Sequence, residues 1–361
     1  MAKVLLVGYF GYANTGDEAL LEVLSGRLAS WGYTVGALTA SPAASERDYG
    51  ITPFGHKRWS ELIRACRWAD AVVFGGGGLL QDASGPASIW YYLGALKLAQ
   101  QLKKPVALYA QGIGPLRGPF SGKAIRRLAS GVGLLSVRDE GSHQLLVQLG
   151  VHEQKVELAA CPTLLLEPAD DVRLDALIAE EALPTDLPWL GVSLRATPAV
   201  EAAAGELAEG LRRVAEQGLA RPLLIPFQPS QDEGLSWKVR GELGSLGALV
   251  KGSWRPSELL GLIGRCKAVL ATRLHALLFA ANREVPALAI DYDPKVRAAA
   301  QALGVPVLKP AEVEGFELRD RLRALLAEGV TTELCTGCTR LRSTAEAGLE
   351  RLREFLADSK K

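Results

Sequence analysis

The 361-residue sequence contains one methionine, few aromatic residues and no apolar run long enough to span a bilayer. Its first residues form a short apolar segment that ends in glycine, unlike the charged and then apolar pattern of a secretory signal. The formal net charge is only +1, so the composition indicates no overall attraction to nucleic acid or anionic lipid. We therefore expect a cytoplasmic protein that binds no nucleic acid and makes at most a peripheral contact with the inner face of a membrane.

Cysteine and histidine are also scarce, with five and four residues. Cys335 and Cys338 have the spacing of metal and redox sites, but no second pair of cysteines or histidines lies near them in the sequence. Cys66, Cys161 and Cys266 lie in or beside apolar segments, which is typical of small buried side chains. The sequence therefore predicts no metal site and leaves the role of Cys335 and Cys338 open.

Short apolar segments alternate with longer amphipathic segments along most of the chain, which predicts parallel, doubly wound α/β sheets. The length favours two domains. We expect a Rossmann-like domain over residues 1–167, a proline-rich connection over 168–188 and a second Rossmann-like domain over 189–340. The helical segment 341–361 is expected to pack back on the first domain. The simplest architecture is two Rossmann-like domains that face each other across a cleft.

Polar residues follow the first expected strand, at the carboxyl end where parallel sheets bind ligands. They are Asn14, Thr15, Asp17 and Glu18. Asn14 or Thr15 can cap the following helix, and Asp17 or Glu18 can accept a proton or bind a sugar hydroxyl. Capping alone would also explain Asn14 and Asp17, so both interpretations stay open.

A strand expected over residues 71–74 runs into four consecutive glycines, 75–78. Glycines at a strand end let backbone N–H groups approach a ligand closely, although a purely structural run is the alternative. A second glycine-rich turn follows the strand expected over residues 106–109. Four residues of these two turns are expected to line a ligand site: Gly76, Gly77, Gln81 and Gln111.

The segment over residues 268–281 changes from a strand-like pattern to a helical one, and Thr272, Arg273 and His275 lie at the junction. The start of a helix presents unpaired backbone N–H groups and a positive dipole end, so two basic side chains there favour an anion. Lys295 follows the next expected strand, at the same edge of the sheet. The alternative is that Arg273 forms a surface ion pair and the histidine caps the helix.

Seven motifs in this order resemble those of the polysaccharide pyruvyltransferases, most closely the CsaB-type enzymes of bacterial cell-wall polymers. They are GYFGYANTGDE at 8–18, GGGGLLQD at 75–82, QGIGP at 111–115, SVRD at 136–139, SLR at 193–195, TRLH at 272–275 and YDPKV at 292–296. The resemblance covers about residues 3–355 and implies a glycosyltransferase B-like fold. The sequence departs from the family at Cys161, where an aspartate often precedes the proline.

The resemblance implies transfer of a pyruvyl group from phosphoenolpyruvate, a co-substrate, to two hydroxyls of a sugar, without a cofactor or metal. The implied acceptor is N-acetylmannosamine of a lipid-linked or polymer-linked precursor used in S-layer anchoring. Because the donor carries a carboxylate and a phosphate, it needs several cations and N–H donors. The implied donor-binding residues are Arg138, Arg273, Leu274, His275 and Lys295, with Arg138 contributed by the first domain.

His275 is expected to be the proton donor in this scheme, and Arg138 to take part in catalysis. Asp17 or Glu18 is expected to be the base. A glycosyltransferase that uses a nucleotide sugar would share the fold, and a non-catalytic sugar-phosphate binding protein would keep the arginines, so both remain alternatives. The acceptor sugar, the hydroxyls that form the ketal and the oligomeric state are not predicted.

Overall fold

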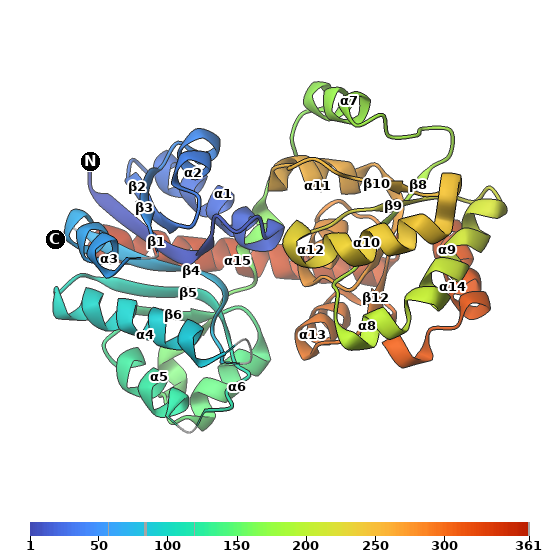
Figure 1. Cartoon of the computed structure of the whole chain (residues 1–361). Helices are drawn as coiled ribbons and strands as arrows, with labels where there is room; N and C mark the ends of the chain where they lie inside the picture. The colour runs from blue at the N-terminus through green and yellow to red at the C-terminus, as the bar shows by residue number, and fades with distance from the viewer. Residues whose placement is uncertain (57, 83–84, 119, 360–361) are drawn as a thin grey trace. The chain divides into compact units, whose positions relative to one another are not determined.

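A computed structural model describes residues 1–56, 58–82, 85–118 and 120–359, which form two compact units (Figure 1). The first unit comprises Met1–Leu165 and Leu341–Lys361, and the second comprises Leu166–Arg340. The stretch expected as a connection, 168–188, belongs to the second unit and contains a helix. The last helix begins in the second unit and ends in the first.

The first unit is a doubly wound sheet of seven parallel strands in the order β3-β2-β1-β4-β5-β6-β7. Its elements in chain order are β1 (Lys3–Phe10), α1 (Thr15–Ser30), β2 (Thr34–Thr39), α2 (Pro42–Tyr49), β3 (Thr52–Gly55), α3 (Trp59–Trp68), β4 (Ala71–Leu80), α4 (Pro86–Gln101), β5 (Val106–Ile113), α5 (Ser121–Ala129), β6 (Leu134–Val137), α6 (Glu140–Gln148) and β7 (Glu157–Leu158). The central strands are buried on both faces, which explains their continuous apolar sequences.

Two strands of this sheet extend further than their sequences predict. The four glycines at 75–78 lie inside β4, and Gln111 lies inside β5, because pairing between these strands continues to Leu80 and Ile113 after a register shift. The prediction of glycine-rich loops at these positions was therefore wrong. The segment between β2 and α3 contains a further helix, α2, and the edge strand β3.

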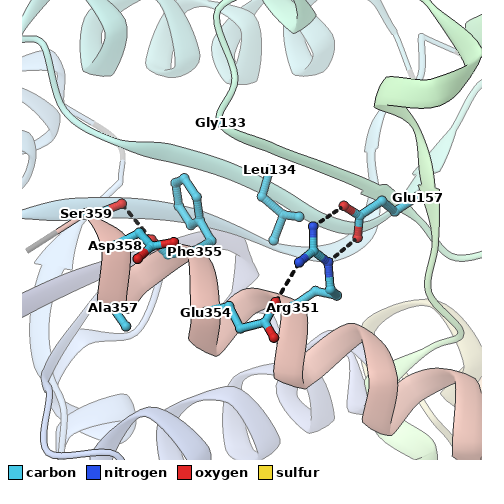
Figure 2. A pocket seen from close by; sticks show the side chains of 9 residues that line it. All are labelled: Gly133, Leu134, Glu157, Arg351, Glu354, Phe355, Ala357, Asp358 and Ser359. Carbon is cyan, nitrogen blue, oxygen red and sulfur yellow. Dashed lines mark hydrogen bonds and ion pairs between the residues drawn. The ribbon is translucent and has the colours of Figure 1, made fainter.

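The C-terminal part of the last helix, α15 (Thr332–Asp358), packs on the first sheet. Gly348 allows it to approach Ala159 and Tyr109, since a Cβ at this glycine would lie 2.6 Å from the Ala159 side chain. Near the end of the helix, Arg351 donates to both carboxylate oxygens of Glu157 on the edge strand β7, at 2.9 and 3.2 Å (Figure 2). A shallow pocket of about 590 Å³ lies beside this ion pair.

The second unit has six parallel strands in the order β10-β9-β8-β11-β12-β13. Its elements are α7 (Asp171–Glu180), β8 (Trp189–Ser193), α8 (Pro198–Ala202), α9 (Ala204–Glu216), β9 (Arg221–Leu224), α10 (Pro229–Leu243), β10 (Ala248–Leu249), α11 (Pro256–Gly264), β11 (Cys266–Ala271), α12 (Leu274–Asn282), β12 (Ala287–Ile290), α13 (Pro294–Leu303), β13 (Val307–Leu308) and α14 (Gly315–Glu328), followed by the start of α15. Across the described residues, no helix is long and apolar enough to cross a membrane.

Candidate active site

The order of the second sheet reverses between β8 and β11, and ligands of open α/β sheets bind outside such a switch point. Thr272 joins the two loops there. Its Oγ1 accepts a hydrogen bond of 2.6 Å from the backbone N–H of Arg195 and lies 3.3 Å from the Ser193 carbonyl, to which it donates. The loop that carries Arg195 is thus fixed beside the start of α12.

The Arg195 side chain lies against Tyr292. Its Nη1 donates to the tyrosine hydroxyl at 3.3 Å, and the guanidinium lies 5.8 Å from the ring centroid. Burial raises the pKa of Tyr292, so this partner stays a neutral phenol. Within the described ranges, Arg195 pairs with no carboxylate, so its charge can bind an anion. In the sequence Arg195 is the last residue of the SLR motif and is not among the expected donor-binding residues. Its place in that motif is the signal that could have identified it.

Arg273, in contrast, is balanced inside the protein. Its Nε and Nη2 donate to the two carboxylate oxygens of Asp232 at 3.0 and 2.5 Å, and both side chains are buried. Burial raises the pKa of Asp232, and the adjacent Arg273 opposes that effect. Arg273 therefore links the starts of α10 and α12, and the direct contact with the donor that the resemblance implies stays a prediction.

Leu274 and His275 occupy the first two positions of α12. The backbone N–H groups of a first helical turn have no partner within the helix, so both residues add positive potential at this sheet edge. Lys295 lies at the start of α13, which follows the neighbouring strand, and Asp293 caps that helix by accepting the Lys295 backbone N–H at 2.9 Å. His275 and Lys295 are both partly exposed.

In the first unit, Glu18 fixes the loop that follows β1. Its Oε1 accepts hydrogen bonds from the backbone N–H groups of Gly11 and Tyr12 at 2.7 and 3.1 Å. Burial raises its pKa to about 7, although these bonds act in the opposite direction. Asn14 caps α1 by accepting the Gly16 N–H at 3.2 Å, which confirms the predicted cap, and Thr15 is the buried first residue of that helix.

Asp17 lies against the glycines of β4. Its Oδ1 is 2.8 Å from the position that a Cβ on Gly77 would take, so only glycine leaves room for this carboxylate. Gly76 and Gly77 both have φ of +78°, a conformation that other residues rarely adopt. Gln81 follows the strand and is partly exposed. The two glycines thus have a structural role, and both are buried.

Gln111 supports this irregular part of β4 from β5. Its Nε2 donates to the carbonyls of Phe74 and Gly76 at 2.9 and 3.2 Å, and the side chain is completely buried. Contact with an acceptor sugar would require this side chain to leave the core. The structure therefore shows a supporting role for Gln111, and its predicted contact with an acceptor stays a prediction.

Arg138, after β6, lies flat on the backbone of Gly112. A Cβ at this glycine would be 2.8 Å from the guanidinium carbon. The Arg138 Nε donates to Asp139 at 3.2 Å, and the side chain is 7% exposed. Burial raises the pKa of Cys161, and both Arg138 and Asp17 are close enough to act on this thiol. Residues distant in sequence therefore converge at the carboxyl edge of the first sheet.

Aromatic side chains lie beside the Glu18 loop, and sequence reasoning did not identify them. Tyr9 and Tyr12 stack with ring centroids 4.1 Å apart, and the Tyr12 hydroxyl shares a hydrogen bond with Nε2 of His56. His56 in turn contacts the edge of Tyr91. These rings carry no charged side chain that would bind a phosphate, and with the carboxyl groups of Asp17 and Glu18 they offer apolar faces and hydrogen-bonding groups of the kind that suit a sugar.

Histidine, cysteine and carboxylate side chains do not gather into a group of three that could hold a metal ion anywhere in the described part of the chain. Cys335 and Cys338 lie one turn apart on α15, and neither forms a disulfide.

Solved structures with this fold include enzymes of sugar metabolism. A UDP-GlcNAc 2-epimerase from Methanocaldococcus jannaschii aligns with a TM-score of 0.66 at 11% identity over 95% of this chain and 99% of its own. A glycosyltransferase from Rickettsia africae aligns with a TM-score of 0.64 at 13% identity over 98% of this chain and 99% of its own. The Anabaena protein Alr3699/HepE in complex with UDP aligns with a TM-score of 0.63 at 12% identity over 99% of this chain and 100% of its own. The expected glycosyltransferase B-like fold is therefore confirmed; such low identities establish the fold alone.

A comparison with curated proteins found no match. The polysaccharide pyruvyl transferase family, in contrast, matches residues 14–294, which is more than half of the chain. The match begins at the cap of α1 and extends past the Thr272 to His275 junction to the start of α13. It shows that the chain belongs to the polysaccharide pyruvyl transferase family.

Proposed function

We propose that this protein transfers the pyruvyl group of phosphoenolpyruvate to two hydroxyls of one sugar, forming a pyruvate ketal and releasing phosphate. The observation that carries the proposal is the group of cations at the switch point of the second sheet. Arg195 has no carboxylate partner among the described residues, and the α12 N-terminus, His275 and Lys295 follow the adjacent strands. A carboxylate and a phosphate on one small molecule match such a group.

The donor would bind in the second unit, with Arg195 and Lys295 as cationic anchors and the Leu274 and His275 N–H groups as further donors. Arg273 would act indirectly, because its ion pair with Asp232 fixes the start of α12. A direct contact between Arg138 and the donor stays a prediction.

The reaction would begin with transfer of a proton from His275 to the methylene carbon of phosphoenolpyruvate, which makes C2 electrophilic. One sugar hydroxyl then forms a bond to C2 while Asp17 or Glu18 removes its proton. The bond between C2 and the phosphate oxygen breaks with its electron pair on phosphate, and the second hydroxyl closes the ketal on C2. The two hydroxyl protons balance the proton given to carbon and the proton released with phosphate or to solvent.

The acceptor would bind in the first unit along Asn14 to Glu18, Gly76, Gly77 and Gln81, where the Tyr9 and Tyr12 rings lie. We propose an amino sugar of a lipid-linked cell-wall precursor, by analogy with the family. Calorimetric titration with phosphoenolpyruvate and with UDP tests the donor. We expect binding of phosphoenolpyruvate that is weakened roughly 10- to 150-fold in Arg195→Gln; tight binding of UDP alone would instead support a nucleotide-sugar enzyme.

A further inference from the structure

One region of the first unit differs in charge from the rest of the chain. Residues 83–138 contain eight lysines and arginines and no aspartate or glutamate, although the whole chain carries almost equal numbers of both signs. Six of the eight are exposed, and none of these six forms an ion pair within the described ranges. They are Lys97, Lys103, Arg117, Lys123, Arg126 and Arg127. The local positive charge is therefore available to a partner.

The exposed residues of each helix in this region form one stripe. Where burial is described, the exposed positions of α4 are Trp90, Lys97 and Gln101, seven and four residues apart, so they follow one line along the helix. The exposed positions of α5 are Lys123, Arg126 and Arg127, which share one face. The two helices are neighbours, since Gln100 donates to the Leu128 carbonyl at 2.8 Å.

Large aromatic side chains lie on the same surface. Trp90 is 46% exposed, and Phe120, directly before α5, is 65% exposed. Trp59 is 56% exposed and lies on Gly94, where a Cβ would be 2.6 Å from its ring. Because Gly94 is one turn from both Trp90 and Lys97, Trp59 joins the α4 stripe. Exposed tryptophan beside unpaired cations is unusual on a surface that contacts only water.

We propose that this α4–α5 surface docks the protein on a bilayer that contains anionic phospholipid. Lysine and arginine gain about 1 kcal/mol each near such a surface, and tryptophan and phenylalanine insert at the level of the headgroups. The cations lie on exposed helix faces, which suits a flat and extended partner better than a narrow strand of nucleic acid. The proposal does not depend on the reaction proposed above, because docking is measured without substrates.

Co-sedimentation of the full chain with vesicles tests this surface. We expect binding to vesicles of equal parts phosphatidylcholine and phosphatidylglycerol, weaker binding as salt increases, and none to phosphatidylcholine alone. We expect a triple variant of α5 to have a vesicle partition coefficient lower by about 100-fold or more; its substitutions are Lys123→Glu, Arg126→Glu and Arg127→Glu. Each lost cation lowers the coefficient by about fivefold, and the three effects multiply. Trp90→Ser should weaken binding without changing its salt dependence.

The matched control reverses three exposed cations of the second unit, Lys238, Lys251 and Lys267, and should bind vesicles like the wild type. Both triple variants should unfold at the wild-type temperature, since they change surface positions. Equal binding of the wild type and the α5 triple variant, or equal binding to neutral and anionic vesicles, would overturn the proposal. So would absence of vesicle binding together with tight binding of a labelled single-stranded oligonucleotide, which would identify a nucleic-acid surface.

Discussion

Arg273 and Asp232 form a buried ion pair through two hydrogen bonds of 3.0 and 2.5 Å, and this pairing distinguishes Arg273 from Arg195. The charge of Arg273 is balanced within the second unit. Arg195 lies at the same switch point and contacts the neutral Tyr292 hydroxyl, and it forms no ion pair with a carboxylate in the described part of the chain. The two arginines should therefore respond differently to substitution.

Asp232→Asn should strongly destabilise the second unit, because it leaves the buried Arg273 guanidinium without its counter-charge. Breaking a buried pair in this way costs about 3–5 kcal/mol in the free energy of unfolding, measured with urea. The control is Asp186→Asn, which breaks the exposed pair with Arg221 and should have a much smaller effect. If both variants lost the same amount of free energy of unfolding, the buried pair would contribute no more to stability than the exposed one, which would contradict the prediction.

Arg195→Gln should leave stability almost unchanged and weaken binding of phosphoenolpyruvate by roughly 10- to 150-fold, the effect of losing one charged hydrogen-bond donor. Calorimetric titration gives the dissociation constant. Lys238→Gln, an exposed substitution in the same unit, is the control and should bind the donor normally. Unchanged affinity in Arg195→Gln would remove this residue from the donor site.

His275→Gln should lower kcat by roughly 10²- to 10⁴-fold, the usual contribution of a positioned general acid, and should largely preserve affinity for the donor. Steady-state kinetics at saturating donor separate the two effects. If the variant turns over normally and only binds more weakly, His275 is an anchor and Lys295 becomes the next candidate for the acid.

The pKa of Glu18, raised from 4.5 to about 7, predicts a loss of stability as pH increases. The folded protein binds this proton more tightly than the unfolded chain does, so the stabilisation is complete below pH 4.5 and is lost between pH 4.5 and 7. The difference is roughly 3 kcal/mol. When the free energy of unfolding is measured with urea across this pH range, it should change less with pH in Glu18→Gln than in the wild type. An identical pH dependence in both proteins would contradict the prediction.

Asp17 and Glu18, the two candidates for the base, give a kinetic prediction. If Glu18 is the base, kcat/KM should increase with pH around an apparent pKa near 7, and Glu18→Gln should abolish that limb. If Asp17 is the base, Asp17→Asn should remove most turnover, while Glu18→Gln mainly disturbs the loop bound through Gly11 and Tyr12. Retention of turnover within a few-fold in both variants would exclude both carboxylates.

Gly112→Ala should displace Arg138, because the new methyl group would lie 2.8 Å from the guanidinium. The guanidinium is the flexible end of its side chain, so we expect a small loss of stability but a loss of activity similar to that of Arg138→Ala. Gly26→Ala is the control: no atom lies within 4 Å of its Cβ position, and alanine favours a helix. Normal activity in Gly112→Ala would argue against a role for the Arg138 position.

The sequence was sufficient to predict the doubly wound sheets and the strand-to-helix junction at Thr272, because apolar strands and amphipathic helices can be recognised from local periodicity. It could not show that Arg273 is paired, since its partner Asp232 is 41 residues away and meets it only in the folded unit. The four apolar residues 106–109 predict a strand that ends before Gln111, which would place this side chain in a turn at the site. Strand pairing with β4 in fact carries β5 beyond it and buries the side chain.

The central claim is tested most directly by incubating the protein with phosphoenolpyruvate and a synthetic lipid-linked acceptor that contains N-acetylmannosamine, while phosphate release and acceptor mass are measured together. We expect one phosphate for each pyruvyl group gained, no product with UDP-sugars, and loss of both signals in His275→Gln. Phosphate release without a change in the acceptor, or sugar transfer from a nucleotide sugar, would contradict it.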